Sequence, residues 1–133
     1  MVKPPSRWQR SRPLLRIAWL CTLACVVVGS LVPRGSALKH AVDALNPSGY
    51  LWHLLAYFLL ALLPALHETR VTLGLQIVAT LAIGLMLEFA QERFSNRAFD
   101  AGDLVANVAG VLAGLTAALR IRPRLGVVRS IGR

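Results

Sequence analysis

Four long apolar stretches are the feature that most restricts how this chain can fold. They run over Leu14–Val32, Tyr50–Leu66, Val71–Gln91 and Leu104–Leu119. Each contains about 16 to 21 residues, close to the ~20 that an α-helix needs to cross the hydrocarbon core of a bilayer. We therefore predict an all-α membrane protein, built as a bundle of four transmembrane helices.

The composition agrees with this class and limits the chain to one domain. Of its 133 residues, 56 % are hydrophobic and 16 % are charged, and the mean hydropathy is +0.58. A soluble domain of this size usually carries more charge and less apolar content. We predict a basic N-terminal segment at 1–13, a four-helix transmembrane domain at 14–119 and a basic tail at 120–133.

The positive charges lie mainly at the two ends of the chain. The net charge is +9, and ten of the 15 Lys and Arg residues lie at or before the start of the first apolar stretch or after the last. These ten are Lys3, Arg7, Arg10, Arg12, Arg16, Arg120, Arg122, Arg124, Arg129 and Arg133. The distribution follows the positive-inside rule, so it places both termini in the cytoplasm and argues against a nucleic-acid-binding face.

This orientation assigns a side of the membrane to each connection. Pro33–Gly49 and Glu92–Phe99 are expected outside, and the short turn His67–Arg70 inside. The expected localisation is the cytoplasmic membrane of a bacterium, as a multi-pass protein. A cleaved signal peptide is the alternative for the first stretch, which has the basic start and apolar run of such a segment.

Two cysteines, Cys21 and Cys25, lie four residues apart in the first stretch and share a helix face. A metal site would need further ligands nearby, and the sequence around them has none. We expect both to be packing residues.

Polar and small residues form one stripe on each of the last three predicted helices. At 100° per residue, the stripe of the fourth helix spans about 80° of arc and that of the third about 60°. The fourth helix contributes Asp100, Asp103, Asn107, Gly110 and Gly114, and the third contributes Gly84, Glu88 and Gln91. On the second helix, His53 and Tyr57 are one turn apart.

The predicted topology brings these stripes to one end of the bundle. His53 lies near the outer start of the second helix, and Glu88 and Gln91 lie near the outer end of the third. The polar residues of the fourth helix lie near its outer start, and Arg97 lies in the outer loop before it. Residues far apart in the sequence are therefore expected to share one depth and one site.

Several of these residues also have a purely structural interpretation. Asp100 can cap the fourth helix, and Asp103 in its first turn can complement the helix dipole. Asn107 can bond to a neighbouring helix, and Gly110 and Gly114 form a GxxxG motif that allows close helix packing. Gly84 on the third helix is expected to be a helix-packing residue as well.

Glu88 is the residue that such interpretations explain least. Gln91 and Arg97 can lie among lipid head groups, and His53 can be an interfacial histidine. A charged carboxylate within the hydrocarbon costs about 2.5–3.5 kcal/mol at mid-helix, so it must be protonated, paired or exposed to a polar cavity. Arg97 or His53 can form an ion pair with Glu88. We therefore treat the whole cluster of polar residues as a candidate functional site.

The order of these residues resembles the VanZ-like family of small multi-pass membrane proteins. The residues that carry the resemblance are Glu88, Gln91, Arg97, Asp100, Asp103, Asn107, Gly110 and Gly114. The segments SLVP at 30–33 and HLLAYFLLAL at 53–62 resemble the end of that family's first helix and its second helix. The resemblance covers residues 14–119 and departs at Gly49-Tyr50, where family members often carry an Asp-Lys pair. It implies an integral membrane protein of the cell envelope and, through the family's namesake, a link to teicoplanin-type glycopeptide resistance.

The favoured hypothesis is a binding module rather than an enzyme. The cluster would hold a lipid head group or an envelope precursor, with Arg97 contacting its phosphate or carboxylate. One alternative is metal-assisted hydrolysis of a head group, with a divalent ion held by His53, Glu88, Asp100 and Asp103. The other is a purely structural role in helix packing. Beyond that divalent metal no cofactor is expected. The expected partners are membrane lipids and not nucleic acid, and the sequence leaves open whether the chain forms a homo-oligomer.

Overall fold

The computed structural model describes residues 7–33, 35–45, 49–94 and 98–122, and for residues 7–10 it describes the backbone alone. Regular structure in these ranges is helical throughout. The helices are α1 (Arg7–Leu31), α2 (Ala37–Leu45), α3 (Tyr50–His67), α4 (Arg70–Phe94) and α5 (Ala101–Ile121). Within the described residues, four of these helices, α1, α3, α4 and α5, are long and apolar enough to cross a membrane. The predicted all-α class with four such helices is confirmed to that extent.

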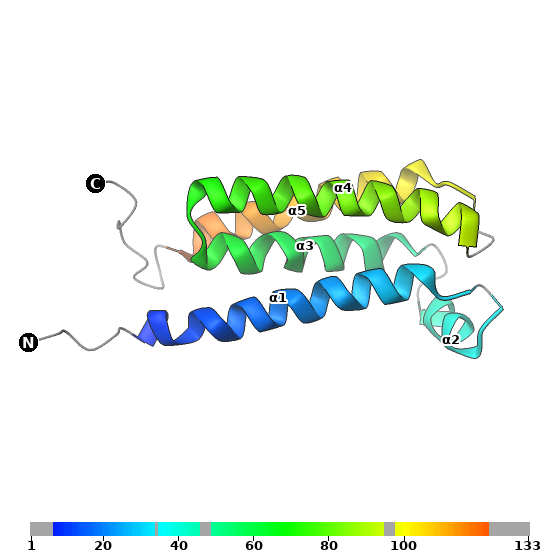
Figure 1. Ribbon diagram of the computed structural model, residues 1–133, viewed down its shortest axis with the longest axis horizontal. Helices are drawn as coiled ribbons and strands as arrows, with labels where there is room; N and C mark the ends of the chain where they lie inside the picture. Colours follow the sequence, from blue (N-terminus) through cyan, green and yellow to red (C-terminus); the bar gives the residue numbers. More distant parts are fainter. Residues whose placement is uncertain (1–6, 34, 46–48, 95–97, 123–133) are drawn as a thin grey trace, which may run out of the picture.

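The four long helices run side by side along one axis (Figure 1). The first turns of α1, the α3–α4 turn and the last turn of α5 lie at one end of this bundle, here called the terminal end. The short helix α2, the start of α3, the end of α4 and the start of α5 lie at the opposite end, here called the α2 end. Polar residues that are distant in sequence are therefore sorted into two groups, one at each end.

The helices are longer than the apolar stretches that predicted them. The first begins at Arg7 and carries Pro13 in an early turn, α4 extends to Phe94, and α5 begins at Ala101. The predicted loop Glu92–Phe99 is therefore shorter than expected, because its first three residues complete the last turn of α4. An apolar stretch ends at its first polar residue, whereas helical hydrogen bonding continues through polar turns.

The connection expected at Pro33–Gly49 contains a helix that we did not predict. Ser36 precedes α2, and its Oγ accepts a hydrogen bond from the Lys39 N–H at 3.2 Å, as a helix-capping serine does. Every residue of α2 is at least partly exposed, and Leu38 and Leu45 are strongly so. A short helix with exposed leucines and polar neighbours is suited to the interface of a bilayer.

The closest helix pair is α3 with α5, and two glycines make it possible. A Cβ atom added to Gly110 would lie 2.4 Å from the Leu54 carbonyl oxygen, and one added to Gly114 would lie 2.4 Å from the Phe58 carbonyl oxygen. Both distances are shorter than a side chain tolerates, so the backbones approach this closely because neither residue has one. The GxxxG motif thus lies at the contact that holds the centre of the bundle together.

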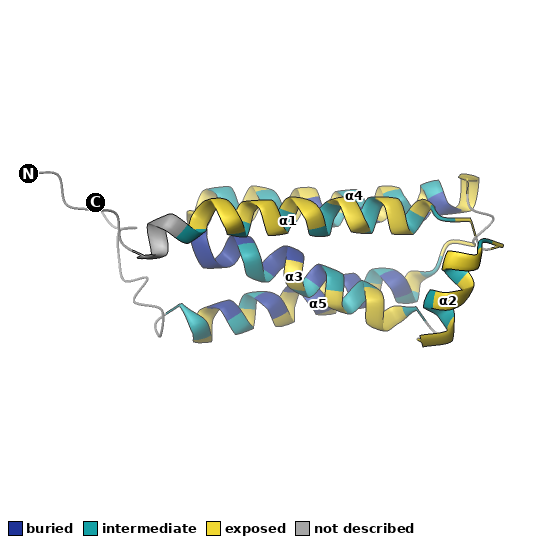
Figure 2. Ribbon diagram, turned by 90° about the horizontal axis from the view of Figure 1, so that it is seen from below, coloured by how far each residue is buried: buried dark blue, intermediate teal, exposed yellow. Residues whose placement is uncertain are grey.

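Burial in the bundle differs from that in a soluble protein, because polar side chains are buried beside a small apolar core and many large apolar side chains are exposed. The buried residues include Thr80, Glu88, Gln91, Asp103 and Asn107. Large apolar side chains are exposed on all four long helices, among them Leu14, Val28, Leu55, Val71, Leu75, Met86, Leu112 and Leu119. Figure 2 shows the buried positions concentrated on α3 and α5, whereas α1 is intermediate or exposed over residues 11–31. This is the pattern expected when lipid surrounds the protein and polar groups face inward.

The prediction that Cys21 and Cys25 are packing residues is wrong, because both are exposed on α1. In lipid an apolar or weakly polar side chain can face outward without penalty, so a shared helix face in an apolar stretch does not indicate which way that face points.

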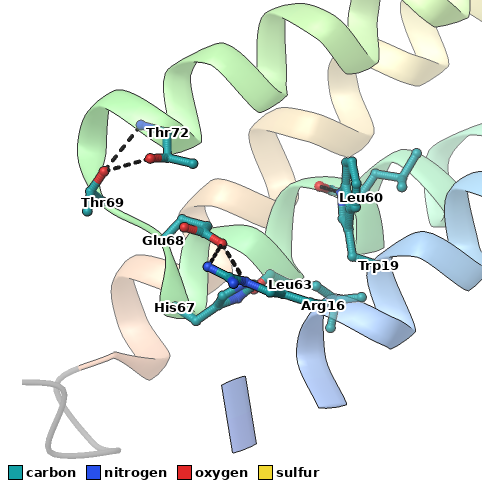
Figure 3. A network of polar contacts seen from close by, with 8 residues as sticks. All are labelled: Arg16, Trp19, Leu60, Leu63, His67, Glu68, Thr69 and Thr72. Carbon is teal, nitrogen blue, oxygen red and sulfur yellow. Dashed lines mark hydrogen bonds and ion pairs between the residues drawn. The ribbon is translucent and has the colours of Figure 1, made fainter. Parts of the chain in front are cut away.

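The contact between α1 and α3 depends on a proline. Pro64 lies inside α3 and is buried. The Leu60 carbonyl would normally accept a hydrogen bond from the N–H of residue 64, which proline lacks. Trp19 of α1 donates its Nε1–H to that carbonyl at 3.1 Å (Figure 3). Because an unsatisfied carbonyl is costly in lipid, this bond both repairs α3 and attaches α1 to it.

Candidate functional site

Three helices bring His53, Glu88 and Asp103 together at the α2 end. His53 lies in the first turn of α3, Glu88 in the last turns of α4 and Asp103 in the first turn of α5. One nitrogen or carboxylate oxygen from each side chain lies within 4.8 Å of the others. Glu88 and Asp103 are each 1 % exposed, and the His53 side chain is 15 % exposed. With Asn107 these residues form a group that we call the α2-end cluster.

The two ring nitrogens of His53 have different neighbours. Nδ1 lies 3.0 Å from Oδ1 of Asn107, and Nε2 lies 3.4 Å from Oδ2 of Asp103. An amide oxygen accepts hydrogen bonds and cannot donate them, so this contact assigns the proton of a neutral imidazole to Nδ1. The lone pair of Nε2 is then available on the side where the Asp103 carboxylate lies.

Gly84 and Tyr57 bring α4 close to the cluster. A Cβ atom on Gly84 would lie 2.2 Å from the Tyr57 hydroxyl oxygen and 3.2 Å from Nδ2 of Asn107. The buried Tyr57 hydroxyl therefore occupies the space that a larger residue at position 84 would need. Gly84, expected from the sequence to be a packing residue, lies where α4 meets α3 and α5.

Gln91 lies on the same face of α4 as Glu88, one turn closer to the end of the helix. It is 1 % exposed, and neither its Nε2 nor its Oε1 has a hydrogen-bond partner among the described residues. A buried amide left without partners costs about 1–3 kcal/mol. A polar molecule that supplied these hydrogen bonds would be stabilised at this position.

Asp100 is expected from the sequence to belong to the cluster, but its hydrogen bonds have a structural role. Its Oδ1 accepts a hydrogen bond from the Gly102 N–H at 2.7 Å, which caps α5. Its Oδ2 accepts a hydrogen bond from the Tyr50 hydroxyl at 3.1 Å. The helix-capping interpretation therefore accounts for Asp100. It does not account for Asp103, which is buried beside His53. Arg97 lies outside the described residues.

A second polar group, at the terminal end, was missed by the sequence analysis. Oε1 of Glu68, in the α3–α4 turn, lies 3.0 Å from Nη2 of Arg16 and 3.0 Å from Nε2 of His67 (Figure 3). The Arg16 Nε–H donates to the same oxygen at 3.1 Å, and His67 Nδ1 lies 2.7 Å from the Leu63 carbonyl oxygen. We call Arg16, His67 and Glu68 the terminal-end network. Its sequence signals are a lone arginine in the first apolar stretch and a His-Glu pair in a very short turn.

Comparisons of the chain with protein-family models, with curated proteins and with solved structures gave no match. The fold and the site define a class: an all-α bundle whose described residues include four helices long and apolar enough to cross a membrane, with a buried polar cluster at one end. Assignment to the VanZ-like family stays a prediction that depends on the motif between residues 88 and 114.

Proposed function

We propose that this protein binds the polar head group of a membrane lipid, or of a lipid-linked envelope precursor, at the α2-end cluster. One observation carries the proposal: three titratable side chains from three helices lie within 4.8 Å of one another inside an apolar bundle. Ionisable groups at membrane depth are costly, and where they occur they usually contact a ligand, an ion or a proton pathway.

The position of the cluster supports a ligand that enters from the end of the bundle. His53 lies in the first turn of α3, and its partial exposure leaves the cluster accessible there. Helix α2, at the same end, exposes Leu38 and Leu45, which are suited to the level of the lipid head groups. The amide of Gln91, which has no partner among the described residues, adds a donor and an acceptor one turn from Glu88.

The proposal includes an orientation and a family. The basic ends of the chain favour a cytoplasmic terminal end. The cluster would then face the outer leaflet of a bacterial cytoplasmic membrane, where envelope precursors carry their head groups. The motif from Glu88 to Gly114 supports membership of the VanZ-like family, and teicoplanin sensitivity is the phenotype to measure first in cells.

Native mass spectrometry in mild detergent tests the binding directly, with the wild type compared with Glu88→Gln and Arg97→Ala. We expect a co-purified lipid on the wild type and its loss or strong reduction in both variants. Arg93→Ala is the matched control, since Arg93 is an exposed arginine in the last turn of α4, and it should keep the lipid. A wild type without lipid, or equal lipid on every variant, would contradict the proposal.

A purely structural role is the second candidate, and the contact between His53 and Asn107 favours it. This contact joins α3 to α5, as polar bonds between membrane helices often do. It predicts that Asn107→Ala lowers thermal stability and that Glu88→Gln leaves lipid content unchanged. Lipid loss in Glu88→Gln without a loss of stability would exclude it as a sufficient account.

A further inference from the structure

We propose that His53, Glu88 and Asp103 bind a divalent metal ion of the Zn²⁺ or Mn²⁺ type. One imidazole and two carboxylates form a ligand set suited to these ions, because imidazole favours Zn²⁺ and carboxylate oxygens also favour Mn²⁺. Asp100, which the sequence grouped with them, is engaged in capping α5. The ion would be a structural or catalytic component of the site, and its binding does not depend on the lipid proposal.

The distances in the cluster are close to those of a coordinated ion. Around a tetrahedral Zn²⁺ with bonds of about 2.1 Å, two ligand atoms are about 3.4 Å apart. His53 Nε2 and Asp103 Oδ2 are 3.4 Å apart. The third ligand atom, from Glu88, lies within 4.8 Å of both. Coordination would draw this Glu88 oxygen toward the other two ligand atoms.

The surroundings of His53 match those of a metal-binding histidine. Such a histidine usually donates its other ring N–H to an oxygen acceptor, which fixes the tautomer and directs the free nitrogen at the ion. Asn107 Oδ1, 3.0 Å from Nδ1, is that acceptor here. It leaves Nε2 and the Asp103 carboxylate, two electron-pair donors, facing each other, and a cation between them would turn this repulsion into attraction.

Charge gives an independent argument. Glu88 and Asp103 are both buried and within one ion's reach of each other. Two carboxylates this close destabilise each other when both are ionised. A divalent cation would neutralise both charges at once, which is how carboxylates in low-dielectric sites are commonly stabilised.

The ion would also explain how an acidic site accepts a phosphate-bearing head group. With three protein ligands, one or more coordination positions stay open to an outside oxygen. A phosphate oxygen could occupy such a position, although this link, unlike the binding of the ion, rests on the proposed function.

The test uses the full-length protein in mild detergent with any affinity tag removed. Cys21→Ser and Cys25→Ser are included, because two exposed thiols one turn apart can bind Zn²⁺ on their own. After a chelator wash and dialysis against Zn²⁺ or Mn²⁺, bound metal is measured by elemental mass spectrometry and affinity by titration calorimetry. We expect about one ion per chain.

Matched variants locate the ion. We expect His53→Ala, Glu88→Gln and Asp103→Asn each to weaken binding by about 100-fold or more, and Asn107→Ala by about 10-fold or more. Glu92→Gln and His40→Ala change exposed residues outside the cluster and should leave binding unchanged. If a cluster variant does not fold, the wild type carries the test: its melting temperature should rise with added metal, saturate at about one equivalent and fall again with chelator.

The outcomes separate the two proposals. Absence of ion binding by the wild type, or equal binding by the cluster variants and the controls, would overturn the metal site, whether or not lipid is retained. In that case a proton shared between His53 and Asp103 accounts for their contact. Stoichiometric metal on a protein that carries no lipid would support the metal site and count against the head-group proposal.

Discussion

The two ends of this bundle solve the problem of burying charge in different ways. In the terminal-end network, Glu68 is 8 % exposed and contacts Arg16, whose side chain is 62 % exposed and reaches toward the surface. One carboxylate there faces one guanidinium, and the His67 ring lies beside it with Nε2 3.0 Å from Glu68 Oε1 and Nδ1 at the Leu63 carbonyl oxygen. In the α2-end cluster, two buried carboxylates share the neighbourhood of one imidazole. The first arrangement pairs one carboxylate with one guanidinium, whereas the second places two carboxylates beside one imidazole, where a cation would be attracted.

The contrast shows that a polar residue near a helix end is not by itself a sign of function. Arg16 and Glu68 stabilise the place where α1 meets the α3–α4 turn, and an ion pair of opposite charges suffices for that. Glu88 and Asp103 place two carboxylates beside His53 where three helices converge, which is a poor way to hold helices together. A residue set that is costly for stability is the better candidate for binding.

The largest expected effect comes from the close contact between α3 and α5 at Gly110 and Gly114. Gly110→Leu or Gly114→Leu should lower the free energy of unfolding by about 3 kcal/mol or more, because the new side chain meets a carbonyl oxygen of α3. Yield and thermal stability in detergent measure this. Gly74→Ala is the control, since a Cβ there meets nothing within 4 Å. Normal stability of the leucine variants would contradict the described α3–α5 packing.

The second prediction compares the same chemical change at the two ends. Glu68→Gln should destabilise the protein by about 1–2 kcal/mol, less than a fully buried ion pair would lose because Arg16 is largely exposed. Glu88→Gln should cost less than Glu68→Gln, because it relieves the repulsion between two neighbouring buried carboxylates and keeps the side-chain shape. Thermal unfolding of the two purified variants, with metal removed, checks the difference. Equal destabilisation by both changes would contradict the claim that the carboxylates at the two ends contribute differently to stability.

The third prediction concerns the attachment of α1 beside the terminal-end network. Trp19→Phe should cost about 1–2 kcal/mol, because it leaves the Leu60 carbonyl without a donor. The same change in a Pro64→Ala background should cost clearly less, since the new backbone N–H at position 64 can serve that carbonyl. A double-mutant cycle measures the coupling. Identical costs in both backgrounds would show that Trp19 does not act through this bond.

The smallest effect is expected beside the α2-end cluster but not within it. Asp100→Ala removes the cap of α5 and the acceptor for Tyr50, so it should cost about 1 kcal/mol. Asp100→Asn keeps a capping oxygen and should recover most of that loss. Neither change should alter lipid or metal binding. A strong binding defect in Asp100→Asn would show that Asp100 belongs to the binding site.

Much of the α2-end cluster is predictable because it depends on two simple rules. Helical periodicity places Glu88 beside Gln91, and Asp103 beside Asn107, on one face of each helix. The up-and-down order of the spans then brings these faces to the depth of His53. The depth of a residue in the bundle and the helix face that it occupies both follow from the local sequence. The cluster can therefore be predicted without knowing which helices pack against each other.

The features that the sequence did not predict depend on how the helices turn toward each other. Hydropathy marks a span but does not determine its rotation about its own axis. For this reason the outward direction of Cys21 and the pairing of Arg16 with Glu68 could not be read from the sequence. The choice of Asp100 between cap and cluster depends on Tyr50, which is 50 positions away. Helix α2 had a local signal in Ser36, which was overlooked because the connection was treated as a loop.

The most direct test of the account measures bound lipid on the two carboxyl-to-amide variants in parallel. Native mass spectrometry of Glu88→Gln and Glu68→Gln, purified in the same detergent, compares one change at each end of the bundle. The account predicts that Glu68→Gln keeps the lipid of the wild type and that Glu88→Gln loses it. Retention of the lipid by Glu88→Gln, or an equal loss from both variants, would contradict a head-group site at the α2-end cluster.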